Sequence, residues 1–288
     1  MNNEQMLNSI YKKNTNLLKS VIDENIKYIY TEDYTDEQKK SAFILDRSLC
    51  DLYESIKYHF NNGLNQTSMN VVFRSFFETY INILYLYKLD SKLSFSKKLR
   101  IYSYCEALSR KKILSIGDPN SPSGQTMDEI LSRKHNNNDL GIDVNPDLEK
   151  LNEFINSETF NEIREEGRRL KKKKVYSWYN FFSGFENDRG LRGVCKYVDK
   201  EELYLFLYSY LSSDVHGLKL FSGYEKPEDI MLDSLVDHNF IYFFANQMFA
   251  EVIESMNKFN DSVGYKTISI DEITEDLMQA REMILEVK

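Results

Sequence analysis

The chain has 288 residues, of which 42% are hydrophobic and 28% charged, and this composition excludes a globally disordered protein. It holds only 11 glycines and 4 prolines, too few turn-forming residues for a β-sandwich or a barrel. The 37 basic and 45 acidic residues give a net charge of −8, so any contact with a nucleic acid requires a local basic patch. We therefore expect an all-α protein, a multi-helix bundle with a long central apolar helix and one polar insertion.

The cysteines and histidines favour neither a disulfide framework nor a metal site. The chain has three cysteines, an odd number without Cys-x-x-Cys spacing: Cys50, Cys105 and Cys195. The four histidines lack the spacing of metal ligands. We expect free thiols, no metal, no cofactor and a cytoplasmic location. No signal peptide and no apolar run of membrane-spanning length is found, and the many Asn, Lys, Ile and Tyr residues are typical of an AT-rich bacterial genome.

Four long helices are predicted in the first 116 residues, from apolar residues at three- and four-residue steps. They cover about 3–28, 36–62, 67–89 and 94–116. Gly63 follows the second helix as a C-terminal glycine should. The third helix is apolar nearly all round, which places it at the centre of the bundle.

The second half begins with a polar insertion at about 117–146, which holds three of the four prolines and where we expect proteases to cut first. The predicted elements after it are two shorter helices within 147–174, a helix at 199–213, a core helix at 227–259, an extended segment at 265–270 and a final surface helix. We expect an N-terminal helix and linker (1–35), a bundle core (36–262) and a C-terminal extension (263–288).

Two polar stripes interrupt these apolar helices. Asn70, Arg74, Glu78 and Asn82 follow one another at four-residue steps along the third helix. The structural interpretation is an ion pair that sets helix register, and the functional alternative is a site.

The second stripe lies on the helix at 199–213 and just beyond it, at Tyr204, Tyr208, Ser212 and His216. Its structural interpretation is helix capping by the histidine. We predict that the two stripes converge in one hydrogen-bonded cluster, because unpaired polar groups are costly in a dry bundle. The candidate catalytic residues are Arg74, Glu78, Tyr208, Ser212 and His216.

A basic run is the other candidate site. Aromatic residues at 176, 178, 179 and 181 follow it, a combination typical of nucleic-acid contact surfaces. The run consists of Arg168, Arg169, Lys171, Lys172, Lys173 and Lys174. Glutamates at 162, 165 and 166 precede it, so a basic C-terminus that complements the helix dipole is the structural alternative. No phosphate-binding loop, dinucleotide fingerprint or hydrolase elbow is present.

Three ordered motifs carry a family resemblance: "VVFRSFFETY", "YSWYNFF" and "YSYLSSDVHG". They resemble the bacterial helical family called domain of unknown function 5677, which shares an Arg-x-x-x-Glu helix and a Tyr-x-x-x-Ser-x-x-x-His element. The resemblance covers about residues 40–250 and maps these elements onto Arg74 with Glu78 and onto Tyr208, Ser212 and His216. It implies a helical fold and no particular activity.

A looser resemblance is to HEPN nucleases of toxin and phage-defence systems, which use an Arg-x(4–6)-His motif. Here positions 209–211 are Ser, Tyr and Leu, so that arginine is absent from the helix of His216. We favour a binding or interaction module with RNA or a protein as partner, in a defence or toxin system. The alternative is a metal-independent RNase in which His216 is the general acid or base and Arg74 stabilises the phosphorane-like charge. The oligomeric state is open, and a homo-oligomer is compatible with the sequence.

Overall fold

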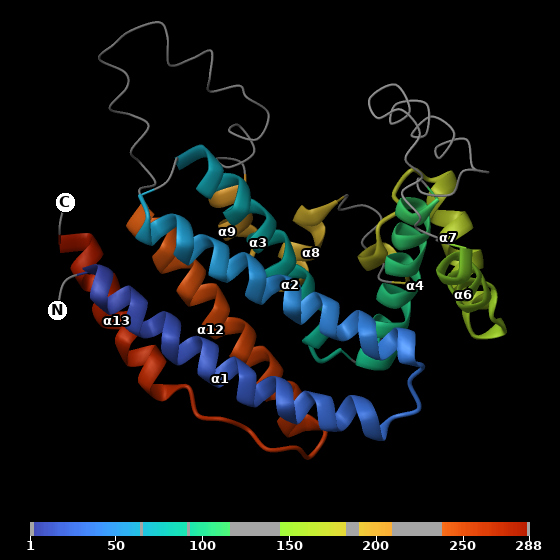
Figure 1. Ribbon diagram of the computed structural model, residues 1–288, viewed down its shortest axis with the longest axis horizontal. Helices are drawn as coiled ribbons and strands as arrows, with labels where there is room; N and C mark the ends of the chain where they lie inside the picture. The colour runs from blue at the N-terminus through green and yellow to red at the C-terminus, as the bar shows by residue number, and fades with distance from the viewer. Residues whose placement is uncertain are drawn as a thin grey trace, which may run out of the picture. The chain divides into compact units, whose positions relative to one another are not determined.

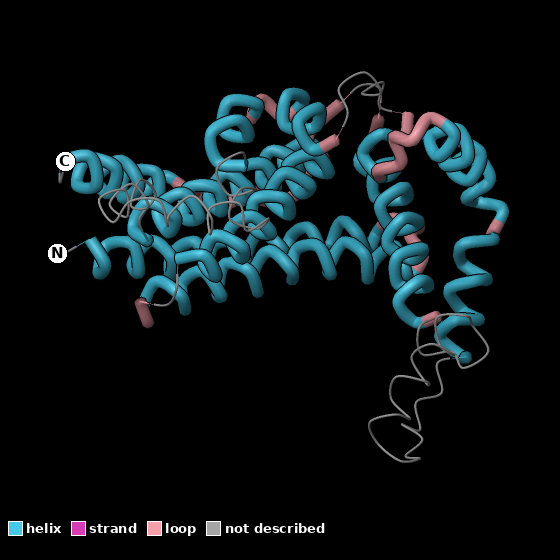
Figure 2. Tube along the Cα trace, turned by 90° about the horizontal axis from the view of Figure 1, so that it is seen from above, coloured by secondary structure: helices cyan, strands magenta, loops and turns pink. Residues whose placement is uncertain are grey.

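The computed structural model describes residues 3–63, 66–90, 93–115, 145–182, 190–208 and 238–286. Within these ranges the chain forms helices and connecting turns, and no strand occurs in them (Figures 1 and 2). The all-α prediction is confirmed. The predicted insertion at 117–146 lies outside the described residues, except for its last two positions, which begin a helix.

The first four helices match their predicted ranges to within a few residues because each carries its own apolar periodicity. They are α1 (Asn3–Thr31), α2 (Asp36–Asn61), α3 (Gln66–Tyr87) and α4 (Phe95–Leu114). Gly63, just past α2, has φ +57°, the left-handed conformation that glycine supplies at helix ends.

The helices between α4 and α12 are shorter than the first four. The elements after α4 are α6 (Asn145–Asn156), η1 (Glu158–Phe160), α7 (Asn161–Lys172), η2 (Trp178–Asn180), α8 (Leu191–Tyr197), α9 (Glu201–Leu203), the π-helix η4 (Tyr204–Tyr208), α12 (His238–Ser262) and α13 (Asp271–Glu286). The helix expected at 199–213 is present in its described part, where one α-turn is followed directly by a π-helix. Residues 227–237, where the core helix was expected to begin, lie outside the described residues.

Residues 265–270, expected to be extended, form no strand. No neighbouring strand pairs with them in the described chain. Instead, the Asn257 side chain makes two hydrogen bonds to the backbone of Ile268, one as donor and one as acceptor. Its Nδ2 donates to the Ile268 carbonyl at 2.7 Å, and its Oδ1 accepts from the Ile268 N–H at 3.0 Å. A side-chain amide thus replaces a strand partner and holds the connection to α13.

The described residues divide into two compact units. Unit 1 comprises Met1–Tyr34, Ala42–Phe95 and Asp188–Lys288, and unit 2 comprises Thr35–Ser41 and Ser96–Asn187. The domain boundaries expected from the sequence stay a prediction.

The core of unit 1 is built on α3, as its apolar character predicted. Seven of its side chains are completely buried: Met69, Phe73, Phe76, Phe77, Tyr80, Ile81 and Ile83. Helix α12 packs against both α3 and α1, and α13 lies along α1 and α12 (Figure 1).

A buried polar network links α1, α2 and α12 within this core. Asn14 Nδ2 donates to the Tyr53 hydroxyl at 3.1 Å and to the Asn246 carbonyl at 3.0 Å, and the Tyr53 hydroxyl donates to Asn246 Oδ1. Nearer the start of α1, the Tyr242 hydroxyl donates to Asn8 at 3.0 Å. The contacts join residues in the same order along the two helices, so α1 and α12 run parallel. They also hold the register, because a shift of either helix would leave buried donors and acceptors without partners.

Unit 2 contains α4, α6 and α7. Gly167 in α7 allows a close approach of the segment that follows the helix, since a Cβ there would stand 3.3 Å from the rings of Phe181 and Tyr176. Lys97 near the start of α4 pairs with Glu162 near the start of α7 at 3.1 Å, and Cys105 farther along α4 lies 3.9 Å from the Tyr176 hydroxyl, just after α7. The two helices therefore run in the same direction and end at the same side of the unit.

Candidate functional site

Arg74 and Glu78, the first pair of predicted site residues, are brought together on α3. Arg74 Nε donates to Glu78 Oε1 at 3.2 Å. The Arg74 side chain is 18% exposed and that of Glu78 is 42% exposed. The pair therefore lies at the edge of the core, with its carboxylate in contact with solvent. Asn70, one turn earlier, is buried.

The other half of the predicted cluster is not placed by the described chain. Tyr208 is the last residue of the π-helix η4, and Ser212 and His216 lie outside the described residues. The predicted four-residue register assumed α-helical geometry from Tyr204 onward, whereas a π-helix has i→i+5 hydrogen bonds and a wider turn. Convergence of the two stripes stays a prediction.

The basic run occupies the C-terminal turn of α7 and the residues just beyond it. Arg169 is held by Glu166 through two bonds of 2.6 Å each. The other cations of the run are exposed: Arg168, Lys171, Lys172, Lys173 and Lys174. Their position complements the partial negative charge of the helix C-terminus, as the structural alternative requires.

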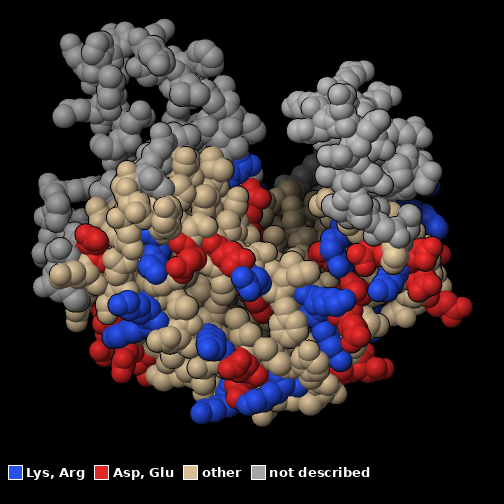
Figure 3. Space-filling model, viewed as in Figure 1, with Lys and Arg blue, Asp and Glu red and all other residues tan. Residues whose placement is uncertain are grey.

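The structure adds two lysines to this surface. Lys111 and Lys112 lie in the last turn of α4, which ends at the same side of unit 2 as α7. Lys171 Nζ lies 4.9 Å from the centre of the Tyr176 ring, and Trp178, two residues on, is half-buried. We call Arg168, Lys171–Lys174, Lys111 and Lys112 the basic surface. On the face shown in Figure 3, side chains of both signs alternate, so positive charge is a local feature.

Sequence reasoning missed a carboxylate, Glu251 on α12. The Tyr80 hydroxyl donates to Glu251 Oε2, Lys200 Nζ lies 2.8 Å from the same oxygen, and Gln247 Nε2 donates to Oε1 at 3.4 Å. Burial, with the negative charge of Glu251 beside it, raises the pKa of Tyr80 well above its usual value, so this phenol stays a hydrogen-bond donor.

A signal for Glu251 was present in the sequence. Gln247, Glu251, Glu254 and Lys258 recur at three- and four-residue steps along an otherwise apolar helix. It is the same kind of polar stripe that drew attention to α3.

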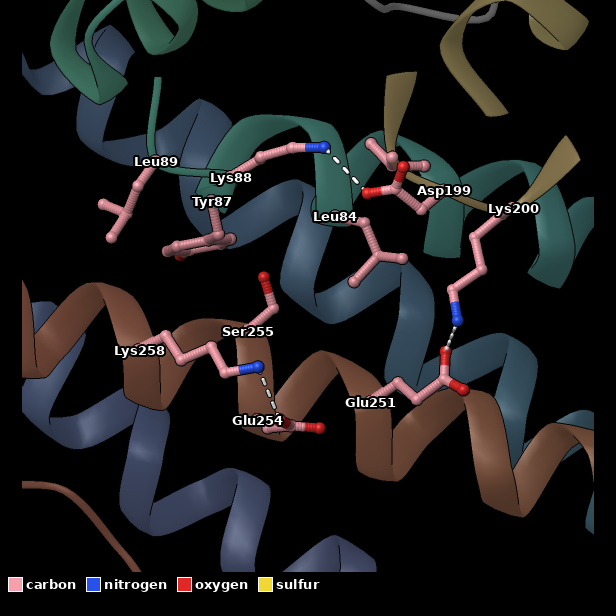
Figure 4. A pocket seen from close by; sticks show the side chains of 11 residues that line it. Leu84, Tyr87, Lys88, Leu89, Asp199, Lys200, Glu251, Glu254, Ser255 and Lys258 are labelled. Atoms are coloured by element: carbon pink, nitrogen blue, oxygen red, sulfur yellow. Dashed lines mark hydrogen bonds and ion pairs between the residues drawn. The ribbon is translucent and has the colours of Figure 1, made fainter. Parts of the chain in front are cut away.

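Glu251 lines a pocket of about 460 Å³ in unit 1. Three stretches of chain form it: the end of α3, the turn after α8, and α12 (Figure 4). Its walls carry three ion pairs, each between a lysine and a carboxylate: Lys88–Asp199 at 3.1 Å, Lys200–Glu251 at 2.8 Å and Lys258–Glu254 at 2.5 Å. Leu84, Tyr87, Leu89 and Val198 supply apolar surface.

The turn that presents Asp199 has a defined geometry. Lys200 N–H donates to the Cys195 carbonyl at 2.6 Å and Asp199 N–H to the Lys196 carbonyl at 3.3 Å, the two bonds of a Schellman motif at the end of α8. Asp199 occupies the left-handed position of this motif, with φ +61°. Glycine is the usual residue there, because a side chain is disfavoured at positive φ.

Neither thiol chemistry nor a metal centre is indicated by the described residues. All three cysteines are free. Burial raises the pKa of Cys50 to about 11 and those of Cys105 and Cys195 to about 12, which makes them poor nucleophiles at neutral pH. In the described part of the chain, no three His, Cys, Asp or Glu side chains gather in a way that could hold a metal ion, and no helix has the length and hydrophobicity needed to span a membrane.

Comparison with known proteins assigns the chain to a family. The model of the family of unknown function DUF5677 matches residues 41–231, about two thirds of the chain. The match includes α3 with Arg74 and Glu78, the basic run, and the turn that carries Asp199. Comparison with curated proteins and with solved structures gave no match. The chain therefore belongs to the family of unknown function DUF5677.

Proposed function

We propose that this chain is a binding module that contacts RNA through the basic surface of unit 2. The observation that carries the proposal is the parallel arrangement of α4 and α7, which brings the lysines of two helix ends to one side of the unit. Phosphate groups are recognised by such clusters of exposed Lys and Arg.

The charge of unit 2 supports a local site for a polyanion. Its residues, 35–41 and 96–187, include 18 Lys and Arg and 16 Asp and Glu, so the unit has a net charge of +2 within a chain of net charge −8. Unit 1 accordingly carries −10. A polyanion is thus repelled by unit 1 and attracted by the basic surface.

Aromatic side chains near the basic surface favour RNA over an acidic protein as the partner. Tyr176, Trp178 and Tyr179 are half-buried and follow the basic run directly. Unpaired bases stack on exposed aromatic faces, and such stacking contributes about 1–3 kcal/mol per base.

Binding of a labelled single-stranded RNA to the full chain, followed by fluorescence anisotropy at several salt concentrations, tests the proposal. We expect binding that weakens with salt, with a log–log slope of about 3–4 if five phosphates are contacted. The double variant Lys171→Glu with Lys172→Glu should bind at least tenfold more weakly. Lys12→Glu with Lys19→Glu, the same charge change at exposed positions of α1, is the matched control.

Equal weakening by both double variants would contradict a local site, because it would show that only the total charge matters. Tight binding of an acidic peptide with no binding of RNA would show a protein partner instead. The RNase alternative is decided in the same reactions, run with EDTA. We expect the RNA to stay intact; cleavage that is lost in His216→Ala would assign the nuclease function.

A further inference from the structure

We propose that the pocket around Glu251 in unit 1 binds a small zwitterion with an apolar body, the chemistry of a hydrophobic α-amino acid. This inference is independent of the basic surface, which belongs to unit 2. The pocket volume of about 460 Å³ is within the range of small-molecule sites, about 300–1,000 Å³.

The charges on the walls decide the class of ligand. Three ammonium groups and three carboxylates line the pocket, so it has no net charge. A polyanion such as a nucleoside triphosphate would meet the carboxylates of Asp199, Glu251 and Glu254, and a polycation would meet the lysines. A molecule with one charge of each sign finds a partner for both.

The donors and acceptors of the pocket suit such a ligand. An ammonium group carries three protons, and among the described residues Lys200 uses one carboxylate partner, Glu251. A ligand carboxylate can therefore bind Lys200, while a ligand ammonium can bind Asp199 or Glu254, whose side chains are 88% and 46% exposed. Figure 4 shows the Ser255 hydroxyl directed into the space between α12 and the end of α3.

The apolar part of the ligand has a complementary wall. Leu84, Tyr87 and Val198 line the pocket and are buried, so they offer apolar surface without side-chain charge.

The backbone conformation of Asp199 places its side chain on the pocket wall. An aspartate in the left-handed position of the α8 Schellman motif is less stable than a glycine would be. At this position the Asp199 carboxylate lies on the pocket wall, beside Lys88. Lys174 at the end of α7 has the same left-handed conformation, so the role of Asp199 rests on its place in the pocket and not on its backbone.

Asp199→Gly separates a binding role from a structural one. Glycine relieves the left-handed strain, and the ion pair that is lost is largely exposed, so the melting temperature of the chain should be unchanged or higher. Binding should nevertheless weaken. A purely structural role of Asp199 predicts a lower melting temperature.

Isothermal titration calorimetry on the full chain tests the inference, with L-leucine and L-phenylalanine as probes. We expect saturable binding of at least one of them, and at least tenfold weaker binding of the matching halves of phenylalanine, 3-phenylpropionate and 2-phenylethylamine. Asp199→Gly and Lys200→Gln should each reduce the affinity at least tenfold, while Lys266→Gln, an exposed lysine outside the pocket, should not.

Three results would overturn the proposal. One is no heat of binding with either amino acid at millimolar concentrations. Another is equal affinity for the zwitterion and one of its halves, which would show a simple ion or apolar site. The third is unchanged affinity in Asp199→Gly and Lys200→Gln, which would place binding elsewhere.

Discussion

Asp46 on α2 is a buried carboxyl group in the core of unit 1. Its side chain is 6% exposed, and burial alone raises its pKa to about 7. Its charge in turn raises the pKa of Tyr87 and of Cys50. In the folded protein Asp46 therefore holds its proton to near-neutral pH, whereas in the unfolded chain its pKa is about 3.9.

We expect Asp46 to make the protein less stable as the pH rises from about 4 to 7. In this window the folded state binds more protons than the unfolded state, so the free energy of unfolding falls, by at most about 4 kcal/mol in total. Asp46→Asn removes this loss because an amide does not ionise. Urea denaturation at pH 5 and pH 8 checks it: the difference in stability between variant and wild type should grow with pH. Parallel pH dependence of the two proteins would show that Asp46 ionises freely when folded.

Tyr53 illustrates how a single hydroxyl stabilises a helical core. It is 1% exposed and bridges Asn14 of α1 and Asn246 of α12. Tyr53→Phe should lower the free energy of unfolding by about 1–3 kcal/mol, because it leaves a buried acceptor without its donor. Tyr58→Phe on the same helix, where the ring is 61% exposed, is the matched control and should change little. Equal effects in urea denaturation would mean that the network contributes nothing.

At the scale of the element, the connection between α12 and α13 depends on one side chain. Asn257 is 8% exposed and makes two hydrogen bonds to Ile268. Asn257→Asp keeps the shape of the side chain but replaces the donor to the Ile268 carbonyl by an oxygen. We expect a loss of about 1–3 kcal/mol in the free energy of unfolding and faster amide exchange at 265–270.

The control for this element is Asn16→Asp, the same chemical change at an exposed position of α1. If both variants exchange their amides at 265–270 at the wild-type rate, the amide of Asn257 does not hold the connection. The helices on either side should keep their protection in both cases, since their apolar faces are unchanged.

At the scale of the whole molecule, the three thiols lie in both units and none has the environment of a reactive cysteine. Cys50 and Cys195 belong to unit 1 and Cys105 to unit 2, and burial raises the pKa of each. Because the thiolate is the reactive form, we expect Ellman's reagent at pH 8 to label the native protein slowly and all three thiols quickly in concentrated urea. A single fast-reacting thiol in the native protein would reveal an exposed, activated cysteine.

The two units also differ in their charge. The carboxylates of unit 1 outnumber its cations, and its polar pocket is balanced in charge, whereas unit 2 gathers lysines at two helix ends. The proposed zwitterion would bind unit 1 and the proposed polyanion would bind unit 2, so neither proposal excludes the other. Membership in the family of unknown function DUF5677 limits neither.

The amino-acid sequence by itself determined the all-α class, the ranges of the long helices, the glycine that ends α2 and the membership of the family. The helical features depend on interactions between residues a few positions apart, which apolar periodicity and capping record directly, whereas the family is indicated by three short motifs in order. It also indicated the Arg74–Glu78 pair, since both side chains lie on one face of one helix. The tertiary structure alone decided the rest. The pocket of Glu251 combines residues near 88, 199 and 251, and the basic surface combines helix ends near 112 and 172. Such groups meet only when helices pack, and packing is governed by long-range burial that no local pattern specifies.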